Sequence, residues 1–130
     1  MMAGQATKKV LIIDDDPDIR EVTQLSLEVS RGWQIITAIS GLEGIEIAIA
    51  EQPDLILLDV MMPGLNGVAT LQRLKQHPKT QPIPVIFLTA HVQVTKTERE
   101  QYDKLGIELI LSKPFDPLLL ADAIAHALHW

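Results

Sequence analysis

The sequence predicts an α/β fold in which a parallel sheet of five strands is covered by helices on both faces. Four short runs are almost wholly apolar, without alternation, which is typical of strands buried on both sides. Segments with helix-start and helix-stop residues separate them, so a strand followed by a helix recurs five times. The apolar runs are 10–13, 55–58, 85–88 and 109–111, and the β-branched segment 34–39 is predicted to be the remaining strand.

Each predicted helix begins at a recognisable cap. Asp-Pro pairs at 16–17 and 116–117 combine an N-cap with proline at the first helical position. The segments 40–43 and 95–98 match the capping box, and Asn66 is predicted to cap the third helix. The first four predicted helices are each followed by residues that stop a helix, namely Gly32, Pro53, the pair His77-Pro78 and Gly106. The last helix is predicted at 118–128.

Length and composition limit the classes of protein to consider. The chain has 130 residues, a formal charge of −6 and no cysteine. One domain over 1–130 is predicted, with a flexible tail at 1–7 and neither a disulfide framework nor a thiolate metal site. No apolar segment approaches the ~20 residues that span a bilayer, and no basic stripe is present. We therefore expect a cytoplasmic protein that binds neither membranes nor nucleic acid directly.

Acidic residues follow two of the predicted strands. Asp14, Asp15 and Asp16 come directly after the first apolar run, and Asp59 comes directly after the 55–58 run. A strand-end Asp often caps the next helix, and Asp16 before proline is explained in this way. Asp14, Asp15 and Asp59 are not. If these two strands are neighbours, three carboxylates converge at the edge where open α/β sheets bind ligands.

Converging carboxylates require a cation or a proton. Two like charges ~4 Å apart repel by about 4 kcal/mol at an effective dielectric near 20. Oxygen ligands with room for water suit Mg²⁺. Zinc fits poorly, because the chain has no cysteine and no pair of histidines at ligand spacing.

Two further side chains are predicted at the same edge. Thr89 follows the 85–88 run and Lys113 follows the 109–111 run. Alone, such a threonine is usually a turn residue and such a lysine is usually solvated. Together with the carboxylates they supply what is needed to neutralise a phosphoryl group that a carboxylate attacks in line.

Four motifs, in this order, resemble the response-regulator receiver family, and in particular its single-domain, chemotaxis-regulator-like members. They are the acid motif at 11–17, the phosphoacceptor motif at 57–67, the segment 88–90 and the segment 112–115. The resemblance covers about 8–128, and the phosphoacceptor motif is its most specific part. It implies a doubly wound, flavodoxin-like fold with strand order 2-1-3-4-5, for which this family is itself a standard example.

The resemblance also implies roles for individual residues. Asp59 is expected to receive a phosphoryl group from the phosphohistidine of a histidine kinase, or from a phosphotransfer protein. Asp14, Asp15, Asp59 and the backbone carbonyl of Met61 are expected to arrange Mg²⁺. Thr89 and Lys113 are expected to contact phosphoryl oxygens, and the Lys113–Pro114 peptide bond is expected to be cis. Such a chain is a switch that catalyses only its own phosphorylation and dephosphorylation, rather than an enzyme.

The chain departs from the family pattern at three positions. Many relatives carry an aromatic residue or histidine where Ile110 stands here. Ile110 is expected to redirect the switch toward Thr89, or else to be a strand residue that packs on the last helix. Met61 and His91 occupy the two positions that tune the dephosphorylation rate in the family.

Alternatives to the phosphorylated switch remain. One is a receiver-like scaffold that is never phosphorylated. Another is a Mg²⁺-dependent phosphohydrolase with an aspartyl-phosphate intermediate, but such enzymes require an acid two residues after the nucleophile, where this chain has Met61.

The route of output is also open. Without an attached output domain, the chain is expected to bind a downstream partner or pass the phosphoryl group on. The last helix is either largely covered by the sheet or exposes an apolar stripe for a partner or for a homodimer through the last strand and helices.

Overall fold

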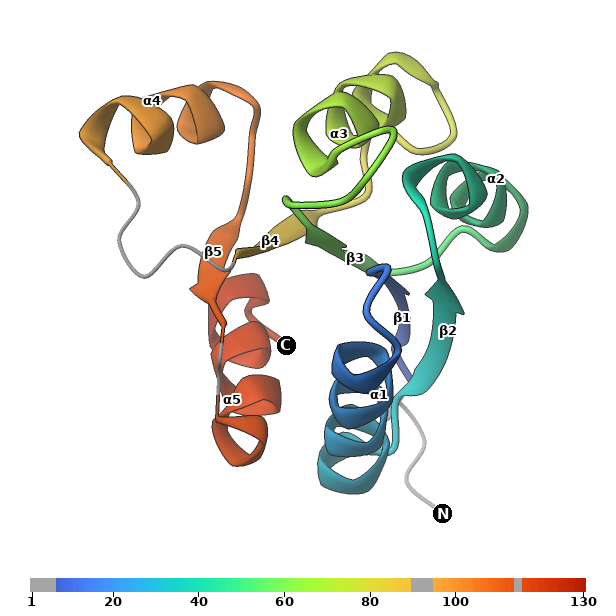
Figure 1. Cartoon of the computed structure of the whole chain (residues 1–130). Coiled ribbons are helices and arrows are strands. Elements are labelled where there is room, and N and C mark those ends of the chain that lie inside the picture. The colour runs from blue at the N-terminus through green and yellow to red at the C-terminus, as the bar shows by residue number, and fades with distance from the viewer. Residues whose placement is uncertain (1–6, 90–94, 114–115) are drawn as a thin grey trace.

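The structure is a computed structural model that describes residues 7–89, 95–113 and 116–130. Five strands and five helices alternate along the chain, as the sequence predicts (Figure 1). The strands are β1 (Lys9–Ile13), β2 (Gln34–Ala38), β3 (Leu55–Asp59), β4 (Val85–Thr89) and β5 (Leu109–Ser112). The helices are α1 (Pro17–Arg31), α2 (Gly41–Glu51), α3 (Gly67–Gln76), α4 (Lys96–Lys104) and α5 (Pro117–Leu128).

All five strands pair in parallel in the order β2-β1-β3-β4-β5, which confirms the order implied by the family resemblance. β1 and β3 are therefore neighbours, with Ile13 opposite Leu58. Asp14, which directly follows β1, and Asp59, the last residue of β3, consequently lie at the same edge of the sheet.

Helices cover both faces of the sheet, with α1 and α5 below it and α2, α3 and α4 above it in Figure 1. A separate apolar core fills each side, and every residue of β3 and β4 is buried. A fully buried Leu or Ile side chain contributes roughly 1.5–3 kcal/mol relative to exposure. The upper core includes Ile13, Leu58, Leu71, Leu74, Phe87 and Tyr102. The lower core includes Ile12, Leu27, Leu57, Ile86, Leu120 and Ile124.

The predicted helix starts are confirmed at all five positions. The side chains of the five N-cap residues accept hydrogen bonds from backbone amides in the first turns, and Thr95 and Glu98 form a full capping box. Gly32 ends α1 in the left-handed region, at φ 65°. β2 is one residue shorter than predicted, because the amide of Ile39 donates to the Glu43 carboxylate at the start of α2.

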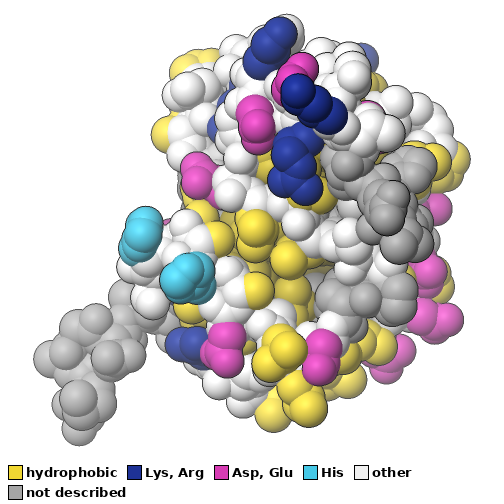
Figure 2. All heavy atoms as spheres, turned by 90° about the vertical axis from the view of Figure 1, so that its left-hand side faces the viewer, with side chains coloured by type: hydrophobic (Ala, Val, Ile, Leu, Met, Phe, Trp, Pro, Cys, Tyr) yellow, Lys and Arg dark blue, Asp and Glu magenta, His cyan; other side chains and the backbone are white. Residues whose placement is uncertain are grey.

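The last helix, α5, has one buried and one exposed face. Leu120, Ala121 and Ile124 face the lower core, whereas Leu118 and Leu119 are 82% and 60% exposed. Apolar side chains gather below the charged helix α4 on the face shown in Figure 2. No helix within the described residues is long and apolar enough to cross a membrane.

Candidate functional site

Three carboxylates converge at the carboxyl ends of β1 and β3. Each of Asp14, Asp15 and Asp59 offers an oxygen within 4.8 Å of the other two. Asp14 is fully buried, Asp59 is 3% exposed and Asp15 is exposed. The predicted convergence is thus confirmed, and it follows from the pairing of β1 with β3.

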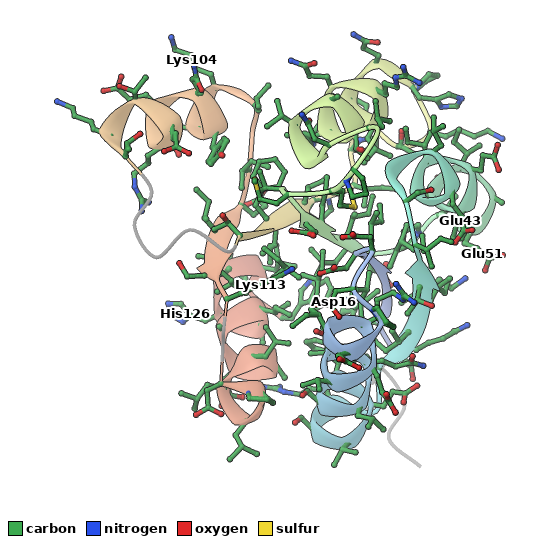
Figure 3. All side chains as sticks on the ribbon, in the orientation of Figure 1. Asp16, Glu43, Glu51, Lys104, Lys113 and His126 are labelled. Atoms are coloured by element: carbon green, nitrogen blue, oxygen red, sulfur yellow. The ribbon has the colours of Figure 1, made fainter. Side chains whose placement is uncertain are left out.

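Lys113 crosses the sheet edge to reach both buried carboxylates. Its Nζ donates to Asp14 Oδ2 at 2.8 Å and lies 3.4 Å from Asp59 Oδ1. In Figure 3 the Lys113 side chain extends from the end of β5 toward the start of α1, where Asp16 lies. The backbone amide of Lys113 also donates to the carbonyl of Thr89, which ties β5 to β4 at this edge.

Backbone amides hold the two buried carboxylates in place. The amide of Asp16 donates to Asp14 Oδ1 at 2.9 Å, so both oxygens of Asp14 are engaged. The amide of Met61 donates to Asp59 Oδ1 at 3.1 Å. The hydrogen bond from Met61 and the ion pair with Lys113 both use Oδ1 of Asp59. Within the described residues, Oδ2 has no hydrogen bond or ion pair.

The surroundings of Asp59 and Lys113 raise the pKa of both side chains. Burial and the neighbouring Asp14 carboxylate raise the pKa of Asp59 to about 6, against the lowering effects of Lys113 and the Met61 amide. Burial alone would lower the pKa of Lys113, but hydrogen bonding and attraction to Asp14 and Asp59 raise it above its usual value. The site therefore holds an ammonium group and more negative charge than that group neutralises.

The loop from β3 to α3 is fixed by close backbone contacts. The amide of Val60 donates to Leu88, and the amide of Gly67 donates back to the Val60 carbonyl. A Cβ atom at Gly67 would lie 2.5 Å from the carbonyl oxygen of Asp59, so only glycine allows this approach. The Met61 side chain, midway along the loop, is exposed.

Arg20 also belongs to the site, although the sequence motifs did not indicate it. From the end of the first turn of α1, its guanidinium donates to the backbone carbonyl of Asp14 at 2.7 Å. The Asp16 cap turns the chain back over the end of β1, so a residue six positions after Asp14 returns to it. A long cation one turn after an Asp-Pro cap is the signal that could have indicated this contact.

The remaining predicted site residues are only partly placed. Thr89 is buried and ends β4, at the same edge as Asp59. Ile110 packs against the upper core with Phe87 and Tyr102. The expectation that it packs on the last helix is wrong, because α5 lies on the opposite face. His91 and the Lys113–Pro114 peptide bond fall on residues outside the described ranges.

The donor set fits a hard divalent cation. All three potential ligands are carboxylates, two of them are buried, and one is exposed at the rim, where water could complete the coordination shell of a bound ion. Burial first, and then the Asp14 carboxylate, raise the pKa of Asp59, and a bound cation would oppose both effects.

Comparisons with known proteins agree with this geometry. A family model described as "Response regulator receiver domain" matches residues 10–125. The DNA-binding dual master transcriptional regulator RpaA of Synechocystis is 40% identical over 108 residues, which are 83% of this chain and 44% of RpaA. This chain thus spans less than half the length of that relative.

Shorter relatives match along nearly their whole length. The protein PilH of Pseudomonas aeruginosa is 34% identical over 117 residues, which are 89% of this chain and 93% of PilH. The chemotaxis protein CheY4 of Vibrio cholerae superposes with a TM-score of 0.86 at 26% identity, covering 94% of this chain and 99% of CheY4.

Proposed function

The chain belongs to the response regulator receiver domain family, and from this premise we propose that it accepts a phosphoryl group on Asp59. The observation that supports this most directly is the placement of Asp59. Its carboxylate is nearly buried, carries a raised pKa and lies 3.4 Å from the Lys113 ammonium. The family interacts with histidine kinases or phosphotransfer proteins, and we propose a phosphohistidine as the donor.

The transfer step uses Oδ2 of Asp59, because Oδ1 is engaged by the Met61 amide and the Lys113 ammonium. Oδ2 attacks phosphorus, an acyl phosphate bond forms, and the P–N bond to the donor imidazole breaks with its electrons returning to nitrogen. Lys113 neutralises charge on the phosphoryl oxygens, and the Thr89 hydroxyl donates to one of them. The Asp14 carboxylate positions the Lys113 ammonium group beside Asp59, and the Arg20 guanidinium positions the backbone of Asp14.

Asp14, Asp15, Asp59 and the backbone carbonyl of Met61 would hold Mg²⁺. When bound, the ion supplies neutralisation of the carboxylates and of the phosphoryl oxygens. Dephosphorylation uses the same site, and it requires a water molecule to reach phosphorus on the side opposite the Asp59 oxygen. We assign control of its rate to Met61, whose exposed side chain lies two residues from Asp59, and to His91.

The conformational response is proposed to run through Thr89 rather than β5. Ile110 is stiff about χ1 and has no polar tip, and it packs against the upper core, which contains the Phe87–Tyr102 ring pair. Amide exchange with beryllofluoride and Mg²⁺ is expected to change most at 59–67 and 89–95 and less at 109–112. The strongest change at 109–112 would show that β5 carries the response.

The exposed leucines of α5 support a protein-partner surface. Leu118 and Leu119 lie in the first turn after Asp116, on the side of α5 turned away from the lower core. We assign them to a kinase, a phosphotransfer protein or a downstream partner. The homodimer expected through the last strand and helices stays a prediction.

Neither alternative function gains support. A phosphohydrolase needs a titratable group two residues after the nucleophile, and Met61 has none. A passive scaffold has no need of a buried acid pair bridged by a lysine, a costly arrangement in the absence of a ligand.

The experiment is labelling of the full chain by acetyl phosphate with Mg²⁺. Asp59→Asn is expected to abolish labelling, whereas Asp103→Asn, which removes an exposed carboxylate on α4, is expected to retain it. Stoichiometric labelling of Asp59→Asn at another residue would refute the assignment. Absence of labelling in both the unmodified chain and Asp103→Asn would favour the scaffold.

A further inference from the structure

The outer edge of β2 carries backbone groups that face away from the sheet. The amide of Gln34 donates to Lys8, and the carbonyl of Ala38 accepts from Asp14. Backbone groups alternate sides along a strand, so Gln34, Ile36 and Ala38 bond to β1. Ile35 and Thr37 direct their N–H and C=O groups outward. Within the described residues these four groups have no hydrogen-bond partner.

This edge lacks the features that normally prevent strand pairing. Between Arg31 and Glu43 the chain has no charged residue and no proline. The strand itself is rich in β-branched residues, and the exposed side chains of Ile39 and Leu42 follow it. Proteins usually protect an edge with lysine, proline or a very short strand.

The opposite edge of the sheet is protected. β5 has only four residues, and Glu108 directly precedes it. Strand addition is therefore favoured at β2 and disfavoured at β5. Figure 1 shows α1 and α2 on opposite faces of the sheet at β2, with neither drawn across its outer side.

We propose that the outer edge of β2 pairs antiparallel with β2 of a second copy of this chain. A two-fold axis at Ile36 places Ile35 opposite Thr37 of the other copy, in both directions. The four outward groups of each copy then form four hydrogen bonds between the copies, and the two Ile36 side chains lie next to one another. The contact is isologous, so it closes at a dimer rather than forming a fibre.

The second copy is the occupant that the strand fits best. The strand is uncharged, so it meets itself without like-charge repulsion, and the same five residues supply both sides of the pairing. An interface based on one short strand is smaller than those of stable dimers, so association is weak and depends on concentration. The proposal goes beyond phosphoryl transfer and does not depend on it.

Sedimentation velocity of the full chain from about 10 µM to about 1 mM, the range in which small interfaces dissociate, tests the pairing. Thr37→Pro removes an outward N–H without removing a bond to β1, and proline is tolerated at such an edge position. The unmodified chain is expected to dimerise with rising concentration. Thr37→Pro is expected to weaken the dimer at least about tenfold, because two of the four bonds are lost.

A second variant keeps the test informative if Thr37→Pro does not fold. Gln34→Lys adds an edge lysine at an exposed position and is expected to weaken the dimer. Gln101→Lys makes the same charge change on α4, far from β2, and is expected to leave the dimer unchanged.

Three results would overturn the proposal. The chain could stay monomeric throughout the concentration range. The dimer could survive both β2 variants and be lost in Leu118→Ser, which would place the interface on α5. The Ile35 and Thr37 amides could be equally protected from exchange at all concentrations, which would show that another segment of the same chain covers the edge.

Discussion

The ammonium group of Lys113 lies 2.8 Å from the carboxylate of Asp14, and the carboxylate is fully buried. The two residues are 99 positions apart and follow strands separated in the sheet by β3 and β4. Lys113 therefore spans the ends of the strands between them and contacts Asp59 on the way. This ammonium group and a bound cation would compete for the same oxygens.

Lys113→Gln is expected to tighten Mg²⁺ binding and to reduce phosphorylation. Removing a positive charge close to the cation strengthens binding by at least about fivefold, even at a high effective dielectric. Phosphorylation falls because one neutralising group for the phosphoryl oxygens is lost. Calorimetric Mg²⁺ titration and acetyl phosphate labelling measure the two effects, with Lys104→Gln on α4 as the control. Unchanged Mg²⁺ affinity would show that the ion binds elsewhere.

Asp15→Asn is expected to weaken Mg²⁺ binding and phosphorylation together, because one ligand and one charge are lost. Without Mg²⁺ the variant is expected to be more stable by up to about 1 kcal/mol, since repulsion with Asp14 and Asp59 is relieved near the surface. Thermal unfolding in EDTA and Mg²⁺ titration test both effects. Asp18→Asn removes the same charge from the first turn of α1 and is expected to give no gain in stability, because an acid is favourable there.

The raised pKa of Asp59 predicts how stability depends on pH without metal. The folded state holds the proton up to a pKa of about 6, above the usual value of 3.8. Between these values the folded state binds more protons than the unfolded state, so stability falls as pH rises from 4 to 6. The loss is about 2 to 3 kcal/mol. Urea unfolding of the unmodified chain in EDTA should show this fall relative to Asp59→Asn, and Mg²⁺ should suppress it. Parallel pH profiles of the two proteins would contradict the prediction.

Gly67→Ala is expected to slow phosphorylation as well as lower stability. The new Cβ would approach the Asp59 carbonyl oxygen and the Val60 Cα within 2.6 Å, so the β3–α3 loop must move. A loss of roughly 1–3 kcal/mol is expected from such overpacking. Gly106→Ala is the matched comparison, because Gly106 has a φ of +80° but open space around it. Its cost is backbone strain alone, so stability falls and the labelling rate does not. Equal labelling rates in both variants would contradict the role of Gly67.

Local signals in the sequence determined the elements of this protein. Unbroken apolar runs predicted four of the five strands, because a strand buried on both faces has no polar side to alternate with, and β-branched residues predicted β2. Capping residues such as Asp16 and Asn66 predicted the helix starts, because a helix leaves its first amides without partners. Asp14, Asp59 and Lys113 could be named for the same reason, since each directly follows a strand whose end the sequence marks.

Only the tertiary structure decided the contacts that those residues make. The family resemblance implied that β1 lies beside β3, and the structure confirms it. The reach of Lys113 across two strands has no counterpart in sequence spacing. The Arg20 contact depends on the angle at which α1 leaves β1. The face on which Ile110 lies depends on the side of the sheet to which α5 returns. These features depend on packing between segments far apart in the chain, and local residue preferences do not encode the direction of that packing.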